Sequence, residues 1–228
     1  MTRAAAILFD LDGTLLDTAP DMVGALNRLR VEEGREPLPL AEVRASVSHG
    51  AARLVTVGFP EAAGEGFERL RLRFLDLYAH NLADGTSLFP GVARLLGTLE
   101  ADRVPWGIVT NKPAWLTDPL LERLRLNSRA CCVVSGDTVA ERKPHPLPLL
   151  HAARLTGVPP QHCVYVGDAE RDIVAGLAAG MQTVVAAYGY LGPEDRPLQW
   201  NPHGIVERPA ELLDWLTLRH LDPAATGT

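Results

Sequence analysis

Apolar residues along this chain follow two alternating patterns. Short unbroken apolar runs predict buried strands at residues 4–9, 106–109, 130–134, 163–166 and 183–187. Between these runs, apolar residues recur every three or four positions and predict helices at residues 92–99, 119–126, 146–155, 173–179 and 210–218. Strands that alternate with helices predict a parallel sheet covered on both faces, which is a Rossmann-like α/β fold.

A helical block interrupts this alternation after the first strand. Helical periodicity predicts further helices at residues 22–29, 40–47, 51–57 and 67–78. Thr18 with Asp21 resembles a capping box at the start of the first of them, and Gly34 marks its end. We therefore predict a small all-helical domain at residues 17–83, inserted into a core made of residues 1–16 and 84–228.

Composition and charge limit the partners of the protein. The formal net charge of −6 disfavours nucleic acid and anionic membranes as partners, because an acidic surface repels both. No apolar run approaches the roughly 18 residues of a membrane span, so we predict a cytoplasmic protein, either a monomer or a homodimer. The three cysteines, an odd number without an export signal, argue against a disulfide framework. The tail after Pro223 is predicted to be disordered.

Polar residues follow four of the predicted strands, at the sheet edge where open α/β folds bind ligands. They are Asp10 with Asp12, Thr110 with Asn111, residues 135–137, and Asp168 with Asp172. Lys143 lies just before a helix. All these groups converge if the strands are neighbours.

Such a set of side chains suits phosphoryl transfer. The Asp10 carboxylate can attack phosphorus to give an acyl phosphate, and Asp12 can protonate the leaving oxygen and later accept a proton from water. Asp10 and Asp168 can share a Mg²⁺ ion, which prefers hard oxygen ligands. Backbone N–H groups of the turn through Gly13 can bind an anion. Phosphate oxygens can also accept hydrogen bonds from Thr110, Asn111 and Lys143.

Lysine usage draws attention to two positions. Of 22 basic residues only Lys112 and Lys143 are lysines, and both lie beside the polar segments just described. Lysine is retained in an arginine-rich chain where a compact ammonium cannot be replaced by the planar guanidinium. By contrast, we predict that Arg69, Arg71 and Arg73 form a solvated helix face.

Four segments of the chain resemble the four motifs of the haloacid dehalogenase superfamily. They are FDLDGTLLDT (9–18), VTN (109–111), RKPHP (142–146) and VGDAERD (166–172). The resemblance implies that Asp10 is the nucleophile and a metal ligand, and that Asp12 is the acid/base, with its carbonyl on Mg²⁺. It implies that Asp168 is a metal ligand with Asp172 in an outer shell, and that the phosphate binders are Thr110, Asn111 and Lys143. The helical insertion is similar to the family's small cap domain.

Further segments resemble particular branches of this superfamily. LFPGVARLL (88–96), TNKP (110–113) and the length of the cap are similar to phosphoglycolate phosphatases. SHGAARLV (48–55) and YGYLGPED (188–195) are similar to N-acetylmuramic acid 6-phosphate phosphatases of cell-wall recycling. His49 and Arg53 lie near a predicted cap loop where they could contact substrate, as could Lys112. We predict a Mg²⁺-dependent phosphatase that acts on a small phosphorylated metabolite, either N-acetylmuramic acid 6-phosphate or 2-phosphoglycolate.

Other functions share parts of this pattern. A phosphomutase of the β-phosphoglucomutase type has the same four motifs and a cap, and only turnover of substrates separates it from a phosphatase. A phospho-accepting receiver module also places acids, a hydroxyl residue and a lysine at strand ends, but it is shorter and lacks a cap. A dehalogenase does not need the acid/base that Asp12 supplies, and a silent binding protein would not need every catalytic residue.

Overall fold

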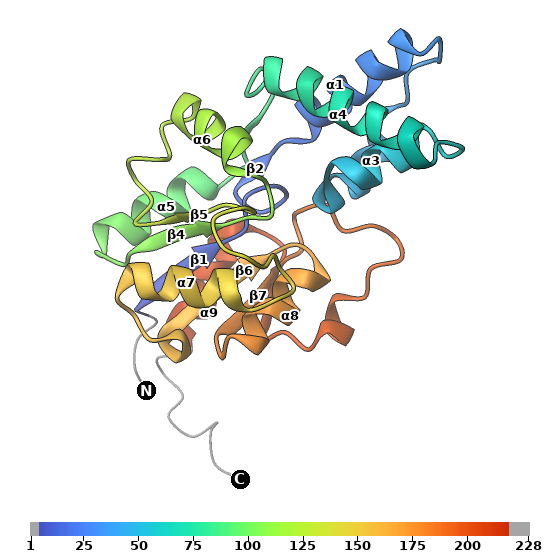
Figure 1. The fold of residues 1–228 in the computed structure, drawn as a ribbon. Helices are drawn as coiled ribbons and strands as arrows, with labels where there is room; N and C mark the ends of the chain where they lie inside the picture. Colours follow the sequence, from blue (N-terminus) through green and yellow to red (C-terminus); the bar gives the residue numbers. More distant parts are fainter. Residues whose placement is uncertain (1–4, 219–228) are drawn as a thin grey trace.

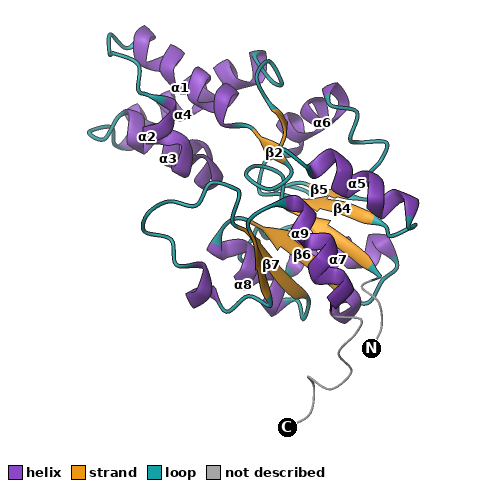
Figure 2. Ribbon diagram, turned by 180° about the vertical axis from the view of Figure 1, so that it is seen from behind, coloured by secondary structure: helices purple, strands orange, loops and turns teal. Residues whose placement is uncertain are grey.

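A central sheet of six parallel strands organises the computed structural model, which describes residues 5–218 (Figures 1 and 2). The strands run in the order β5-β4-β1-β6-β7-β8 across the sheet. Their bounds are β1 (Ala6–Phe9), β4 (Trp106–Val109), β5 (Val133–Val134), β6 (Cys163–Gly167), β7 (Gln182–Ala186) and β8 (Gly204–Val206). The predicted α/β fold is confirmed. The chain leaves β1 first toward β4 and later toward β6, so the strand order reverses at β1.

Helices cover both faces of the sheet because alternate strand residues point to opposite faces. Ile7 and Phe9 pack in one apolar cluster with α5 (Val92–Ala101) and α9 (Pro209–Leu218). Ala6 and Leu8 pack in a second cluster with α7 (Leu147–Thr156) and α8 (Glu170–Ala178). A further helix, α6 (Ala114–Arg123), follows β4. Burial on both faces explains why each strand is an unbroken apolar run.

Four helices lie between the short strands β2 (Leu16–Asp17) and β3 (Ser87–Leu88), which pair antiparallel. They are α1 (Ala19–Glu32), α2 (Leu40–Val43), α3 (Gly50–Gly58) and α4 (Gly64–His80), with a 3-10 helix η1 (Arg44–His49) before α3. Figure 1 shows them as a block beyond one end of the sheet. We call this block the cap. The exact boundaries that we gave it stay a prediction.

Several sequence-based details are wrong. The predicted capping box is absent, because the Asp21 carboxylate instead accepts hydrogen bonds from the N–H groups of Gly85 and Thr86 at 2.6 and 2.9 Å. Asp21 thus ties the start of α1 to the returning chain. Helix α6 begins at Ala114, ahead of its predicted start, and Pro119 lies inside it. Strands β2, β3 and β8 were missed because two or three residues show no periodicity.

Two sequence-based expectations concern the ends of the chain and membranes. The predicted tail and residue 4 of the first strand lie outside the described residues. Within residues 5–218, none of the helices has the length and apolarity to cross a membrane.

Candidate active site

The loop after β1 brings two carboxylates and a tight turn to the sheet edge. Asp10 is buried, and its Oδ1 accepts a hydrogen bond from the Leu11 N–H at 2.8 Å. Gly13 has a φ of 85°, and a Cβ at this position would lie 2.1 Å from Asp168 Oδ2. Only glycine therefore allows this turn to approach Asp168 so closely.

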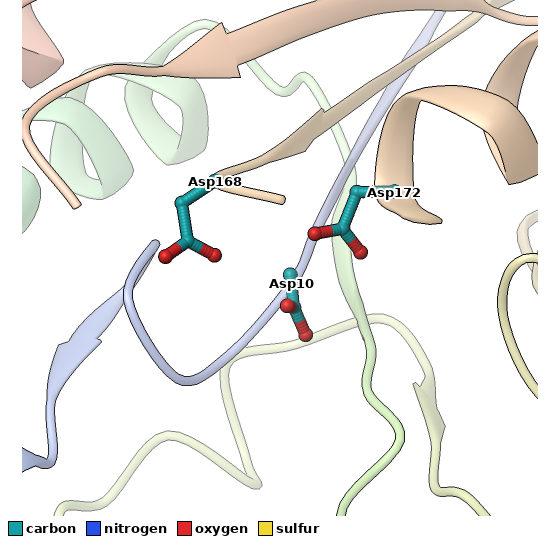
Figure 3. A group of neighbouring side chains, drawn as sticks. All are labelled: Asp10, Asp168 and Asp172. Atoms are coloured by element: carbon teal, nitrogen blue, oxygen red, sulfur yellow. The ribbon is translucent and has the colours of Figure 1, made fainter. Parts of the chain in front are cut away.

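Three carboxylates from distant parts of the chain meet at this edge (Figure 3). Asp10 follows β1, Asp168 follows β6, and Asp172 lies in the first turn of α8. All three are buried, and one oxygen from each lies within 4.8 Å of the others. The sequence left open whether these strands are neighbours, and the pairing of β6 with β1 meets that condition for Asp10 and Asp168.

Asp168 is the member of this cluster with an unused oxygen. Its Oδ2 accepts hydrogen bonds from the Ser48 hydroxyl and the Tyr190 N–H, at 2.5 and 3.0 Å. Its Oδ1 is buried and has no hydrogen-bond partner among residues 5–218. Burial, with repulsion from Asp10 and Asp172, raises the pKa of Asp168 to about 7. A buried, unpartnered carboxylate oxygen beside two further carboxylates has the donor chemistry to hold a hard divalent cation.

Lys143 neutralises the other side of the cluster. Its ammonium is fully buried and lies 2.8 Å from Asp10 Oδ1 and 2.8 Å from Asp172 Oδ1. It also donates to the Val109 carbonyl and the Tyr165 hydroxyl. Burial and the charge of Asp172 raise the pKa of Asp10, whereas Lys143 and Arg171 hold the pKa of Asp172 below its ordinary value against the effect of burial.

Asn111 and Thr110 line the cavity in front of the cluster, but part of their hydrogen-bonding capacity is used by the protein. The Asn111 amide donates to the Lys143 carbonyl at 2.9 Å and accepts from the Lys143 N–H at 3.0 Å. The Thr110 hydroxyl accepts from the Lys112 N–H at 3.1 Å. Asn111 therefore fixes the backbone that carries Lys143, a contact that the sequence pattern did not indicate. The predicted contacts of both residues with phosphate stay a prediction.

Lys112 connects the acid/base candidate to the cap. Its ammonium lies 2.6 Å from Asp12 Oδ1 and donates to the Tyr78 hydroxyl of α4 at 2.8 Å. The two charged side chains are 4% and 15% exposed, so the pair is well screened from solvent. Lys112 thus lines the site, and its two short contacts, with Asp12 and Tyr78, suit a compact ammonium better than a planar guanidinium.

Two segments that resembled N-acetylmuramic acid 6-phosphate phosphatases, one in the cap and one in the core after β7, meet beside the carboxylate cluster. Ser48 lies in the first of them and Tyr190 in the second, and both bind Asp168 Oδ2. The Tyr190 hydroxyl also donates to Asp17 Oδ1 at 2.9 Å, and Arg44 of the cap donates to both oxygens of Asp17. Both segments therefore meet at the seam between the cap and the core, beside the carboxylate cluster.

Cap and core together line an open cavity of about 800 Å³ in front of Asp10. His49 lines the cavity, and burial together with the positive charge of Arg171 lowers its pKa. Arg53 is exposed and is not among the lining residues. Arg69 and Arg73 do lie on a solvated helix face, as predicted, but Arg71 lines the cavity.

Two further lining residues were missed by sequence reasoning. Trp115 follows the second motif and is 52% exposed, and Arg171 lies within the fourth motif. The signal for Arg171 was its place between Asp168 and Asp172. Trp115 gave no signal beyond its position shortly after the second motif.

Comparison with known proteins decides the family. A family model described as haloacid dehalogenase-like hydrolase matches residues 7–186. The chain belongs to this family. A phosphoglycolate phosphatase of Xylella fastidiosa is 46% identical over 203 residues, which cover 89% of each chain. An N-acetylmuramic acid 6-phosphate phosphatase of Pseudomonas putida is 40% identical over 213 residues, covering 92% of this chain and 95% of the relative.

A solved structure agrees with this placement in the haloacid dehalogenase-like family. The crystal structure of a predicted phosphoglycolate phosphatase from Haemophilus somnus 129PT superposes with a TM-score of 0.83 at 28% identity. The match covers 94% of this chain and 99% of that chain. With relatives named as phosphatases, the chain is a phosphatase of this family, which favours hydrolysis over the phosphomutase and receiver alternatives.

Proposed function

We propose that this phosphatase hydrolyses a small phosphomonoester with Mg²⁺ through an aspartyl phosphate on Asp10. The observation that carries the proposal is the buried cluster of Asp10, Asp168 and Asp172, which Lys143 neutralises on one side only. Asp10, Asp168 and the Asp12 carbonyl would hold the metal on the other side, where Asp168 Oδ1 has no hydrogen-bond partner within residues 5–218. When bound, Mg²⁺ would offset the negative charge that otherwise repels phosphate.

The proposed reaction uses this chain's own carboxylates in two steps. A carboxylate oxygen of Asp10 attacks phosphorus, the ester P–O bond breaks, and the leaving oxygen takes a proton from Asp12, which enters this step as the protonated carboxylic acid. In the second step Asp12 accepts a proton from water, the water oxygen attacks phosphorus, and phosphate leaves while Asp10 is regenerated. Lys112, which also donates a hydrogen bond to the Tyr78 hydroxyl, holds Asp12 at the cavity during both steps.

Metal binding should depend on pH in a defined direction. Asp168 has a raised pKa of about 7, and a protonated carboxyl is a poor ligand, so protons compete with the metal below this pH. We expect the apparent Kd for Mg²⁺, measured by calorimetry at pH 6, 7 and 8, to rise as the pH falls, by up to about tenfold per unit below the pKa. Chelation with EDTA should abolish turnover, and added Mg²⁺ should restore it.

Two variants control this measurement. Asp168→Asn should remove Mg²⁺ binding, whereas Asp214→Asn, an exposed carboxylate on α9, should leave the Kd unchanged. Equal Kd values at pH 6 and pH 8, or full activity after exhaustive chelation, would contradict the metal assignment.

The dimensions of the cavity favour the larger of the two predicted substrates. We propose a phosphorylated N-acetylamino sugar with a carboxylate, such as N-acetylmuramic acid 6-phosphate, in preference to 2-phosphoglycolate. A cavity of about 800 Å³ is far larger than a two-carbon acid requires. Its walls include Leu72 and Leu75 of the cap and the exposed ring of Trp115, which suit the apolar face of a sugar ring. The Pseudomonas putida relative carries this substrate in its name.

The ratio of kcat/KM for the two compounds on one preparation tests this preference. We expect the amino sugar phosphate to have the higher value, and Trp115→Ala to lower it by about tenfold while changing the value for phosphoglycolate by less than about twofold. Arg53→Ala, measured in parallel, tests the sequence-based prediction that Arg53 contacts the substrate. If this variant keeps the substrate preference of the unmodified enzyme, Arg53 does not belong to the site. A clear preference of the unmodified enzyme for phosphoglycolate would overturn the substrate proposal.

A further inference from the structure

Arg171 is a cation of the active site to which the four motifs give no role. It lies in the first turn of α8, between the cluster members Asp168 and Asp172, and it lines the cavity in front of Asp10. Its side chain is 20% exposed. A guanidinium in such a position is costly to bury unless it has partners, so its surroundings indicate what it binds.

The hydrogen-bond donors of Arg171 are unused in the part of the chain that the structure describes. Within residues 5–218, its guanidinium donates no hydrogen bond, and its nearest ionic contact is Nη2 to Asp10 Oδ2 at 3.8 Å. Lys143 is different, because its three N–H groups already face four oxygen atoms of the protein. Arg171 therefore offers the cavity a positive charge with a planar set of free N–H groups, the geometry that matches two oxygens of one phosphoryl group.

Distance decides which anion these donors reach. In a reactive complex phosphorus lies about 3–3.5 Å from the attacking oxygen of Asp10, and its non-bridging oxygens surround that position. A guanidinium nitrogen 3.8 Å from Asp10 Oδ2 is within hydrogen-bond range of those oxygens. A carboxylate elsewhere on the substrate would lie beyond the ester oxygen, toward the cap, where Arg71 and His49 line the cavity.

We propose that Arg171 is a catalytic residue that donates hydrogen bonds to the non-bridging oxygens of the transferring phosphoryl group. Its charge adds to that of Lys143 from the cavity side of Asp10. The inference rests on the proposed phosphoryl transfer to Asp10, because that reaction places the phosphoryl group beside this oxygen. It predicts that Arg171 acts on every phosphomonoester alike, whatever the rest of the substrate carries.

Phosphate binding tests the proposal without turnover. Calorimetry with inorganic phosphate and with orthovanadate, on the Mg²⁺-loaded enzyme, should show affinity weakened by about 10- to 100-fold in Arg171→Met, the range for a lost hydrogen bond to a charged group. Arg171→Lys keeps the charge without the planar fork and should recover part of the loss. Arg154→Gln removes an exposed arginine of α7 outside the cavity and should leave both affinities unchanged.

Steady-state kinetics then separates the phosphoryl group from a substrate carboxylate. The test compares two substrates, 2-phosphoglycolate and p-nitrophenyl phosphate, of which the second has no carboxylate. Within each variant, kcat/KM should fall by the same factor for both substrates. This factor should be about 10²- to 10³-fold for Arg171→Met and smaller for Arg171→Lys. A loss confined to phosphoglycolate, or unchanged phosphate and vanadate affinity, would overturn the proposal.

The two proposals fail in different ways. Turnover retained by an Asp10→Asn variant would refute the aspartyl phosphate route, whereas the calorimetry on Arg171 variants would still show whether this residue binds phosphate. Thermal melting of each variant checks that it is folded. If Arg171→Met is unstable, the phosphate affinity of the charge-conserving Arg171→Lys variant tests whether Arg171 binds phosphate.

Discussion

Asp10→Asn should reduce kcat by about 10⁴-fold or more while leaving the protein folded, because it removes the proposed nucleophile with almost no change of shape. The amide keeps a carbonyl oxygen to accept the Leu11 N–H, but it cannot form a stable phosphorylated intermediate. Single-turnover kinetics and mass spectrometry of acid-quenched enzyme would measure the effect. The unmodified enzyme should gain a phosphate on the peptide that contains Asp10, and the variant should not.

Stability separates this loss from misfolding. The pKa of Asp10 is raised by burial and by the charge of Asp172, so the fold disfavours the ionised carboxylate at neutral pH. A neutral amide relieves that repulsion, and Lys143 keeps Asp172 as its ion-pair partner. We therefore expect a free energy of unfolding at pH 7 equal to or above that of the unmodified protein. A variant that melts normally and turns over at a near-normal rate would exclude Asp10 as the nucleophile.

The parts of the site that the sequence predicted are those built from single strands and the loops that follow them. An apolar run followed by a polar turn shows both a buried parallel strand and the place where its side chains emerge. The sequence alone therefore places Asp10, Thr110 and Asp168 at the carboxyl ends of predicted strands. The pairing of β1 with β4 and β6 supplies what the pattern could not, the actual neighbours of each strand.

The missed contacts join segments far apart along the chain. Ser48 reaches Asp168 across 120 positions, and Lys112 reaches Asp12 across 100. Periodicity shows which face of a helix is buried, but not which side chain of the cap meets which loop of the core. This is why the sequence pattern predicted a substrate contact for Arg53, whereas Arg71 of α4 is the arginine of the cap that lines the cavity. The same limit applies to Asp21, whose spacing from Thr18 matched a local cap although its partners are Gly85 and Thr86.

Lysine retention can be tested at the position where the surroundings are tightest. The Lys143 ammonium is fully buried, and four oxygen atoms lie 2.7–2.8 Å from it. These distances suit a compact ammonium, and they leave no room for the wider, planar guanidinium. The cation that neutralises Asp10 and Asp172 must therefore be lysine if both carboxylates are to keep their positions.

Lys143→Arg should lower kcat/KM by about 10²- to 10³-fold although it keeps the positive charge, because the guanidinium must displace Asp10 or Asp172 to fit. Overpacking should also lower the free energy of unfolding by about 1–3 kcal/mol.

Lys143→Met should lower the free energy of unfolding further, by about 3–5 kcal/mol relative to the unmodified protein, because it leaves two buried carboxylates without their shared partner. Activity measured well below the melting temperature of each variant separates the two effects. Arg154→Lys makes the reverse exchange on the exposed face of α7 and should change neither quantity. Full kcat/KM in Lys143→Arg would show that positive charge alone suffices at this position, and the surroundings of Lys143 would then not explain why it is a lysine.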